Sequence, residues 1–444
     1  HPEWLFCELG AQSMGGVTVN LFTSSVTEEV RSALSRVRAT FVVAQDQEQV
    51  DKLLDARDKL PHIRKVVYID PTGMSSYSGH PWLIPFSELQ ERGRALEERN
   101  DGRFDAEVGK GRREDTALMI LTSGTTGIPK LAMISHRNFV EMGTRWREAL
   151  AIQDGENWLS MSPPAWIVDQ MWGMGVAVGT GMTMNFPETA ETIEEDFREI
   201  GPAVLITASR FWEDMASRIR VRMSDAGWLK RKLFFWGETL GRSIVRKELN
   251  KQPVGPGIKV LRFFMNLALY RPLLDRLGCS HFSSAFTGGH PISPEVIRFF
   301  QAVGMNLKQC YGLTEAGGIF QVQPDGEVKP ETVGKPLPGV QIMMNEDQEV
   351  LVKSEALFSG YYRDFQNTEK AFHDGWLKTG DAGYLDQEGH LVIIGRKEDI
   401  IKNKSGQAFS PDFIETRLKF SPYIKEAVVF GEGRPYITAM VNID

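Results

Sequence analysis

The feature that most constrains the fold is an alternation of short apolar runs with helical patterns. Apolar runs rich in β-branched residues occupy positions 41–44, 65–69 and 203–206, whereas residues 26–38 follow a helical pattern. Strands that alternate with helices build parallel or mixed sheets covered by helices. Because 444 residues exceed one ordinary domain, more than one structural unit is expected. We therefore predict an α/β protein whose large N-terminal domain consists of stacked mixed or parallel α/β layers.

The residue composition and patterning of the sequence change at two places. From about Thr332, glycine- and proline-containing turns separate short alternating runs, which predicts a small β-rich subdomain over about 332–395. The charged string RKED at 396–399 is typical of a linker. We predict one large domain over 1–395, followed over 396–444 by a hinge and the beginning of a small α+β C-terminal domain. Both ends of the sequence read as the middle of a structural unit, so we expect the chain to be a piece of a longer protein.

The string LTSGTTGIPK at 121–130 follows an apolar run that predicts a strand. Its glycines permit a tight turn whose N–H groups point at an anion, its hydroxyls add donors, and Lys130 adds charge. This composition predicts that the loop binds a triphosphate. The Walker pattern requires Lys-Ser or Lys-Thr directly after a glycine. Since Ile128 and Pro129 intervene and Leu131 follows, an ordinary P-loop NTPase is excluded.

Three further strings carry side chains that suit a nucleotide. QCYGLTE at 309–315 combines an aromatic ring, a glycine, a hydroxyl and a carboxylate, which could stack a base, bind phosphate and hold a metal. KTGD at 378–381 places a carboxylate on a turn where it could accept hydrogen bonds from ribose hydroxyls. GRKEDIIK at 395–402 precedes Gly406. Each string alone is weak, because polar turns of this kind are common.

In this order and spacing, the four strings resemble those of the acyl-adenylate-forming (AMP-binding) superfamily, which includes acyl-CoA synthetases, peptide-synthetase adenylation domains and beetle luciferases. The strings NLFTSS at 20–25, PPAW at 163–166, SRFWE at 209–213 and GGHPISP at 288–294 are similar to those of its long-chain fatty acid–CoA ligases. Two positions depart from the pattern. Leu131 stands where glycine usually follows the loop lysine, and Ala165-Trp166 replaces a common Ser-His pair.

The resemblance implies a role for each matching residue. The β- and γ-phosphates of ATP would be covered by the loop, which comprises Thr122, Ser123, Gly124, Thr125, Thr126, Gly127 and Lys130. The adenosine would be held by Gly288, Gly289, His290, Gln309, Tyr311, Gly312, Leu313, Asp381 and Arg396, with Tyr311 stacked on adenine and the last two gripping the ribose. Thr314 would bond the α-phosphate and Glu315 would help to hold Mg²⁺. Trp166 would gate the acyl tunnel, Glu398 would be the hinge, and Lys402 and Gly406 would help to form the coenzyme A path.

The implied activity is ATP- and Mg²⁺-dependent conversion of a fatty acid, most simply a long-chain one, to its acyl-adenylate, followed by transfer to coenzyme A. An alternative keeps the first step and changes the acceptor: a fatty acyl-AMP ligase, or an adenylation domain that loads a carrier protein or a reductase. A non-catalytic nucleotide- or lipid-binding protein is a minor third hypothesis. In the resembled family the adenylation lysine lies near the end of the C-terminal domain, so we expect the chain as given to adenylate poorly.

Charge adds one expectation about partners. The net charge of −7 gives no bulk case for nucleic-acid binding, yet residues 216–276 carry 14 Lys/Arg against 4 Asp/Glu among several aromatic residues. This segment reads as a basic, aromatic insertion that meets anionic lipid or an acyl substrate, or as amphipathic helices with an ordinary solvated face. No secretory signal opens the sequence, and the three cysteines have no metal or disulfide spacing. We therefore expect a cytoplasmic protein, with peripheral membrane contact through 216–276, and leave its oligomeric state open.

Overall fold

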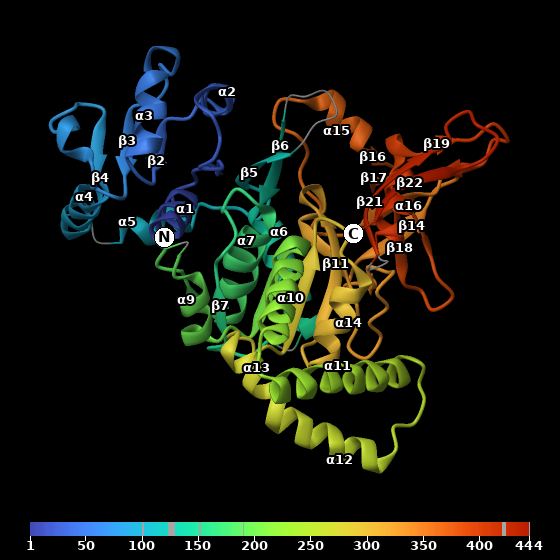
Figure 1. Cartoon of the computed structure of the whole chain (residues 1–444). Helices are drawn as coiled ribbons and strands as arrows, with labels where there is room; N and C mark the ends of the chain where they lie inside the picture. Colours follow the sequence, from blue (N-terminus) through green and yellow to red (C-terminus); the bar gives the residue numbers. More distant parts are fainter. Residues whose placement is uncertain (100–101, 123–128, 151, 190, 420–422, 444) are drawn as a thin grey trace. The chain divides into compact units, whose positions relative to one another are not determined.

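The computed structural model describes every residue except 100–101, 123–128, 151, 190, 420–422 and 444. It contains two compact units, one made of His1–Arg137 and Pro163–Ile167 and the other of Asn138–Ser162 and Val168–Asp444. Each is a mixture of helices and sheets (Figure 1), which confirms the predicted α/β class.

The first unit contains two small sheets. One is parallel in the order β2, β3, β4, and its strands alternate with helices: β2 (Phe41–Ala44), β3 (Lys65–Tyr68), β4 (Leu83–Pro85), α2 (Thr27–Val37), α3 (Gln47–Asp55) and α4 (Phe86–Arg99). The Asp46 carboxylate accepts a hydrogen bond from the Gln49 backbone N–H and so caps α3. The strands predicted at 41–44 and 65–69 and the helix predicted at 26–38 are therefore confirmed.

In the other sheet of this unit, β5 lies between a parallel neighbour, β1, and an antiparallel one, β6. The remaining elements of the unit are β1 (Thr18–Val19), β5 (Thr116–Thr122), β6 (Lys130–Ser135), α1 (Glu3–Ser13), α5 (Arg103–Val108), η1 (Arg57–Lys59) and η2 (Met74–Tyr77). Residues 117–120 of β5 are buried. This burial explains why the apolar run before the glycine-rich string forms a strand.

The second unit is built on a five-stranded sheet in the order β13, β12, β11, β10, β9. Its first three strands along the chain are parallel, and the last two are antiparallel: β9 (Val204–Ala208), β10 (Ser284–Gly288), β11 (Leu307–Leu313), β12 (Gly318–Val322) and β13 (Lys335–Pro336). A parallel pair, β7 (Asn157–Leu159) and β8 (Thr183–Asn185), completes this part.

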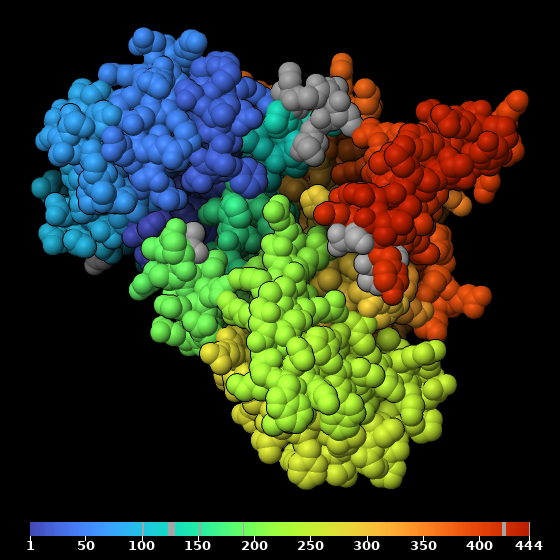
Figure 2. Space-filling view, in the orientation of Figure 1, coloured from blue at the N-terminus to red at the C-terminus, as the bar shows by residue number. Residues whose placement is uncertain are grey.

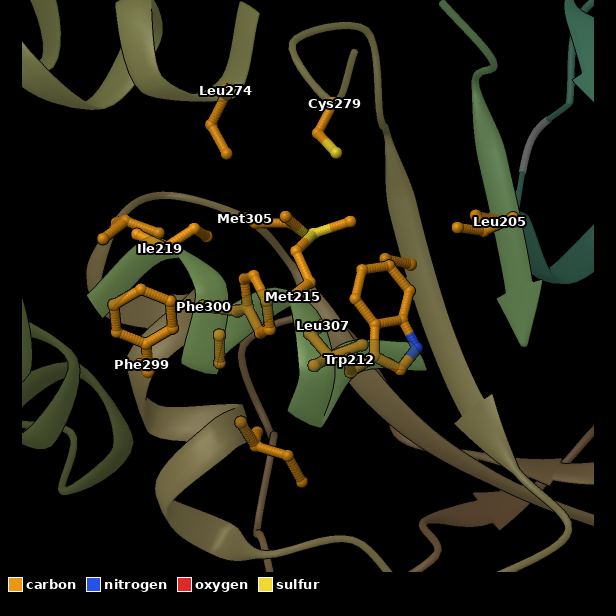
Figure 3. Packing of buried hydrophobic residues seen from close by; sticks show 14 of the residues in the cluster. Leu205, Trp212, Met215, Ile219, Leu274, Cys279, Phe299, Phe300, Met305 and Leu307 are labelled. Carbon is orange, nitrogen blue, oxygen red and sulfur yellow. The ribbon is translucent and has the colours of Figure 1, made fainter. Parts of the chain in front are cut away.

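Helices pack against these strands and supply most of the core. They are α6 (His136–Leu150, which begins with the last two residues of the first unit), α7 (Ile167–Gln170), η3 (Met171–Ala177), α8 (Val178–Thr180), α9 (Ile193–Ile200), α10 (Ser209–Ser224) and α14 (Pro294–Ala302). Figure 3 shows Trp212 of α10 and Phe300 of α14 in the cluster that covers β9, β10 and β11. The Trp212 indole N–H donates to the Phe286 carbonyl at 3.2 Å, so this buried ring is also hydrogen-bonded to the sheet.

The insertion predicted at 216–276 begins within the second half of α10 and continues as a helical hairpin. After α10 it consists of α11 (Trp228–Leu249), α12 (Pro256–Met265), the π-helix η4 (Asn266–Tyr270) and α13 (Arg271–Arg276). Figure 2 shows its yellow-green side chains gathered at one end of the second unit. A Cβ on Gly241 would lie 2.1 Å from the Ala302 carbonyl oxygen, so α11 approaches α14 closely at this glycine.

A second, antiparallel sheet follows in the region predicted to be β-rich. Its elements are β14 (Gln341–Met344), β15 (Glu349–Lys353), β16 (Phe372–His373), β17 (Trp376–Leu385) and β18 (Leu391–Arg396), with α15 (Phe365–Ala371) before β16. The chain then continues through η6 (Lys397–Asp399), β19 (Ile401–Lys402), β20 (Ala408–Phe409), α16 (Pro411–Leu418), β21 (Ile424–Phe430) and β22 (Thr438–Ile443). No described helix is long and apolar enough to cross a membrane.

Candidate nucleotide-binding site

The ends of the predicted phosphate loop lie on adjacent strands of the first unit. Thr122, the last residue of β5, is the register partner of Lys130, the first residue of β6. The loop lysine therefore begins a strand, which sequence reasoning did not anticipate. The predicted phosphate contacts at Ser123, Gly124, Thr125, Thr126 and Gly127 lie outside the described residues.

The predicted acyl gate, Trp166, also belongs to the first unit. Its side chain is half-buried, and its backbone N–H donates to the Pro163 carbonyl at 2.9 Å. The PPAW string thus forms a local turn, and the gating role of Trp166 stays a prediction.

In the second unit, two predicted strings meet at one edge of the parallel sheet. β10 ends at Gly288 and β11 ends at Leu313, and the two strands are parallel neighbours with Thr287 opposite Gln309. Ligands of open α/β sheets bind outside the carboxyl ends of such strands. A Cβ on Gly288 would lie 2.8 Å from the Cys310 sulfur, so a larger residue there would force Cys310 or the strand to shift. Gly289 and His290 follow in an exposed turn.

Tyr311, Asp381 and Arg396 form a hydrogen-bonded group although they are far apart in the sequence. The Tyr311 hydroxyl donates to Asp381 Oδ2 at 2.5 Å, and Arg396 Nε lies 3.4 Å from Asp381 Oδ1. Asp381 of β17 and Arg396 of β18 are also register partners. The Thr379 hydroxyl accepts a hydrogen bond from the Asp381 backbone N–H at 3.1 Å. Two sheets of the second unit therefore bring together the predicted base-stacking ring, on β11, and both predicted ribose ligands, on β17 and β18.

The electrostatics of this group follow from its burial. Burial raises the pKa of Asp381 above its ordinary value, although the hydrogen bond from Tyr311 and the charge of Arg396 act in the opposite direction. Burial and the neighbouring carboxylate raise the pKa of Tyr311 well above its ordinary value. The phenol therefore remains protonated at neutral pH and donates to the carboxylate.

Glu315 lies in the short 3₁₀ helix η5 (Thr314–Ala316), directly after β11. Its Oε1 accepts a hydrogen bond from the Tyr361 hydroxyl at 2.8 Å, and its carbonyl accepts one from the Phe358 backbone N–H at 2.9 Å. Burial and the Glu315 charge raise the pKa of Tyr361. Sequence reasoning missed Tyr361, because 46 residues separate it from Glu315 and no local pattern reports that contact.

The Gln309 side chain is used within the protein. Its amide donates to the Pro330 carbonyl at 2.6 Å and to the Thr332 carbonyl at 3.0 Å. Gln323 accepts from the Gln309 backbone N–H at 2.8 Å. These bonds fix the turn that precedes β13. Gly312 and Leu313, by contrast, are partly accessible at the end of β11.

The predicted hinge and coenzyme A residues follow β18 directly. Glu398 is exposed in η6, and Lys402 is exposed in β19. Gly406 has φ +83° in the turn between β19 and β20, and no described residue other than its chain neighbours lies within 4 Å of where its Cβ would be. The preceding Lys397 is tied to the β-rich sheet, because its Nζ lies 2.8 Å from Asp347 Oδ2.

Comparisons with known proteins identify the family. The family model of AMP-binding enzymes matches residues 1–362, and that of the AMP-binding enzyme C-terminal domain matches residues 398–443. The chain belongs to the AMP-binding enzyme family. The resemblance expected from the four strings is therefore confirmed.

Similar curated proteins of this family are long-chain-fatty-acid–CoA ligases. The chain is 29% identical to FadD15 of Mycobacterium bovis, over 100% of the chain and 71% of that protein. It is 26% identical to heimdall of Drosophila melanogaster, over 100% of the chain and 66% of that protein.

Solved structures share the fold. ATP-bound MatB from Rhodopseudomonas palustris is 20% identical with a TM-score of 0.69, over 100% of this chain and 77% of that one. A Mycobacterium tuberculosis fatty acyl CoA synthetase is 19% identical with a TM-score of 0.67, over 100% and 76%. The AMP-bound A-PCP didomain of the carboxylic acid reductase from Segniliparus rugosus is 18% identical with a TM-score of 0.67, over 100% and 60%.

Proposed function

We propose that this AMP-binding enzyme is an ATP-dependent long-chain fatty acid–CoA ligase. The observation that carries the proposal is the convergence of Tyr311, Asp381 and Arg396 beside the carboxyl ends of β10 and β11, with Glu315 following in η5. The acyl specificity is supported by the names of the relatives that match the whole chain.

In the first half-reaction, an oxygen of the fatty-acid carboxylate attacks the α-phosphorus of ATP. The bond to the β-bridging oxygen breaks, pyrophosphate leaves, and acyl-AMP forms. No protein nucleophile is required, so the protein's contribution is positioning and neutralisation of phosphate charge. Asp381 and Arg396 would hold the ribose, Tyr311 the adenine and Thr314 the α-phosphate. Lys130 and the loop after Thr122 would hold the departing pyrophosphate.

The residues present fit a magnesium ion bound together with the nucleotide. Mg²⁺ prefers carboxylate oxygens and is commonly held by one or two carboxylates plus substrate phosphates. Glu315 presents such a carboxylate, and the Tyr361 hydroxyl fixes its Oε1. Throughout the described residues, no group of three His, Cys, Asp or Glu side chains could form a dedicated metal cage. Bound there, the ion would neutralise phosphate charge.

In the second half-reaction, the coenzyme A thiolate attacks the acyl carbonyl and AMP leaves. Each half-reaction needs a different protein surface next to the same site, and a hinge motion would exchange these surfaces between the two steps. We place that hinge at Glu398, at the start of the predicted domain over 396–444, with Lys402 and Gly406 on the coenzyme A path. Trp166 would gate the acyl tunnel. A long-chain acid is concentrated in lipid, so we propose that the enzyme works in the cytoplasm beside a membrane surface.

A second candidate changes the acceptor. The fold likeness to the carboxylic acid reductase didomain favours considering a carrier protein or a reductase in place of coenzyme A. Mass spectrometry separates the two. The full-length protein is incubated with ATP, Mg²⁺, coenzyme A and a mixture of fatty acids. Acyl-CoA with AMP supports the ligase. Acyl-AMP alone favours the carrier-loading alternative. If neither acyl-CoA nor acyl-AMP forms, a non-catalytic nucleotide- or lipid-binding protein is favoured.

A further inference from the structure

The helix α12 and the π-helix η4 that continues it carry an apolar stripe that faces solvent. Val260, Phe263, Phe264 and Leu267 follow the i, i+3, i+4, i+7 spacing of one helix face, yet they are 57%, 65%, 58% and 61% exposed. The same segment has a separate packed side, because Met265 is buried and the hydroxyl of Tyr270 donates to a carbonyl of α11 at 2.7 Å. Residues at this spacing usually cover a core, whereas this stripe is additional to the core contact.

The helix α11 adds aromatic surface to the same hairpin. Trp228 and Trp236 are 66% and 51% exposed and lie two helical turns apart, on the same side of the helix. Lys232, midway between them, places its ammonium 5.5 Å from the centroid of the Trp228 ring. Two helices of one hairpin therefore expose large apolar side chains.

Basic residues accompany this apolar surface. The segment 216–276, which contains the hairpin together with the end of α10 and α13, carries a net charge of +10 within a chain of −7. Some of its arginines are neutralised locally, as Arg262 is by Glu248 of α11 at 2.5 Å. Lys230, Lys259 and Arg271 are exposed and belong to none of the ion pairs formed among the described residues. The remainder of the chain carries −17, so it would be repelled by an anionic surface.

We propose that this hairpin surface, formed by α11, α12 and η4, docks on an anionic lipid bilayer. Exposed aromatic and aliphatic side chains enter the boundary between headgroups and acyl chains, and lysines and arginines contact anionic headgroups. A nucleic acid would use the charge but would leave the Val260–Leu267 stripe uncovered, so lipid accounts for both properties. The opposite charges of the hairpin and the rest of the chain also fix which face of the protein meets the membrane.

Vesicle flotation tests the proposal and requires no turnover, so its failure is distinguishable from failure of the ligase assignment. We expect the wild-type chain to float with phosphatidylcholine vesicles that contain phosphatidylglycerol, and to float poorly with pure phosphatidylcholine or at high salt. Phe263→Ser/Phe264→Ser should lower the partition coefficient about tenfold or more. Lys232→Gln/Lys259→Gln should lower it roughly 25-fold, at about fivefold per charge. Because all four side chains are exposed, these variants should fold normally.

Matched variants change equally exposed residues elsewhere in the second unit. Phe365→Ser/Tyr436→Ser removes two aromatic rings that are 77% and 66% exposed, and Lys370→Gln/Lys404→Gln removes two exposed charges. Both should float like the wild type. The proposal is overturned if the wild-type chain does not bind anionic vesicles, or if the matched variants lose as much binding. It is also overturned if sedimentation shows that the hairpin variants lose self-association while vesicle binding is unchanged.

Discussion

Tyr361→Phe isolates the contribution of one hydrogen bond to the proposed metal site. The change removes the hydroxyl that donates to Glu315 Oε1 at 2.8 Å. It retains the ring, whose centroid lies 4.9 Å from that of Phe358 in an edge-on contact. A hydrogen bond to a charged group contributes about 1.5–3 kcal/mol. If about half of that energy orients Glu315 toward Mg²⁺-ATP, the loss corresponds to a factor of about 3 to 15 in kcat/KM.

The assay is ATP–pyrophosphate exchange by the full-length protein, with Mg²⁺ titrated at saturating fatty acid. We expect the variant to need more Mg²⁺ and to keep its affinity for the fatty acid. Tyr362→Phe is the matched control, since it removes the neighbouring hydroxyl, which makes none of the described hydrogen bonds. Because the pKa of Tyr361 is raised, its hydroxyl stays protonated and the defect should not vary between pH 6 and 9. An unchanged Mg²⁺ dependence, or an equal defect in Tyr362→Phe, would refute the assigned role.

Three further variants test other parts of the structure. Asp381→Asn should weaken ATP binding in calorimetry about 10- to 100-fold, because the ribose loses a charged acceptor; unaltered affinity would contradict the assignment. Lys329 and backbone hydrogen bonds hold the pKa of Asp386 at about 2, so the ionised form stabilises the fold above about pH 4 and this contribution is lost as the pH falls toward 2. Asp386→Asn should therefore lower the free energy of unfolding, measured with urea at pH 7, by about 2 kcal/mol. The difference in this free energy between wild type and variant should decrease below about pH 4. A difference that does not change with pH would show that the charge of Asp386 is not its cause. Gly241→Ala forces a Cβ against the backbone of α14 and should lower the melting temperature by about 2–4 °C or more. Gly257→Ala should not, because no described residue outside its own helix lies within 4 Å of the added Cβ.

Much of the fold could be predicted because local burial patterns produce it. The apolar runs at 41–44 and 65–69 became parallel strands, and the run before the glycine-rich string became β5. Candidate residues on the ends of β10 and β11 could also be found, because parallel strands end at one edge of the sheet. The motif strings needed no knowledge of tertiary contacts.

What the sequence could not predict depends on contacts between distant elements. Tyr361 lies 46 residues after Glu315 in the chain, and no local pattern around its hydroxyl indicates the contact between them. The amide of Gln309 is directed to a turn 21 residues further along the chain. The exposure of Phe263 and Phe264 could not be predicted either, because an apolar stripe has the same helical spacing whether it faces the core or the solvent.

The central claim is that the α-phosphorus of ATP is the reacting centre, and oxygen transfer tests it most directly. The full-length protein is given a fatty acid labelled with ¹⁸O in its carboxylate, together with ATP, Mg²⁺ and coenzyme A. If the carboxylate attacks the α-phosphorus, one labelled oxygen remains on the released AMP, and mass spectrometry will find it there. Label in inorganic phosphate, or product formed with unlabelled AMP, would contradict the account.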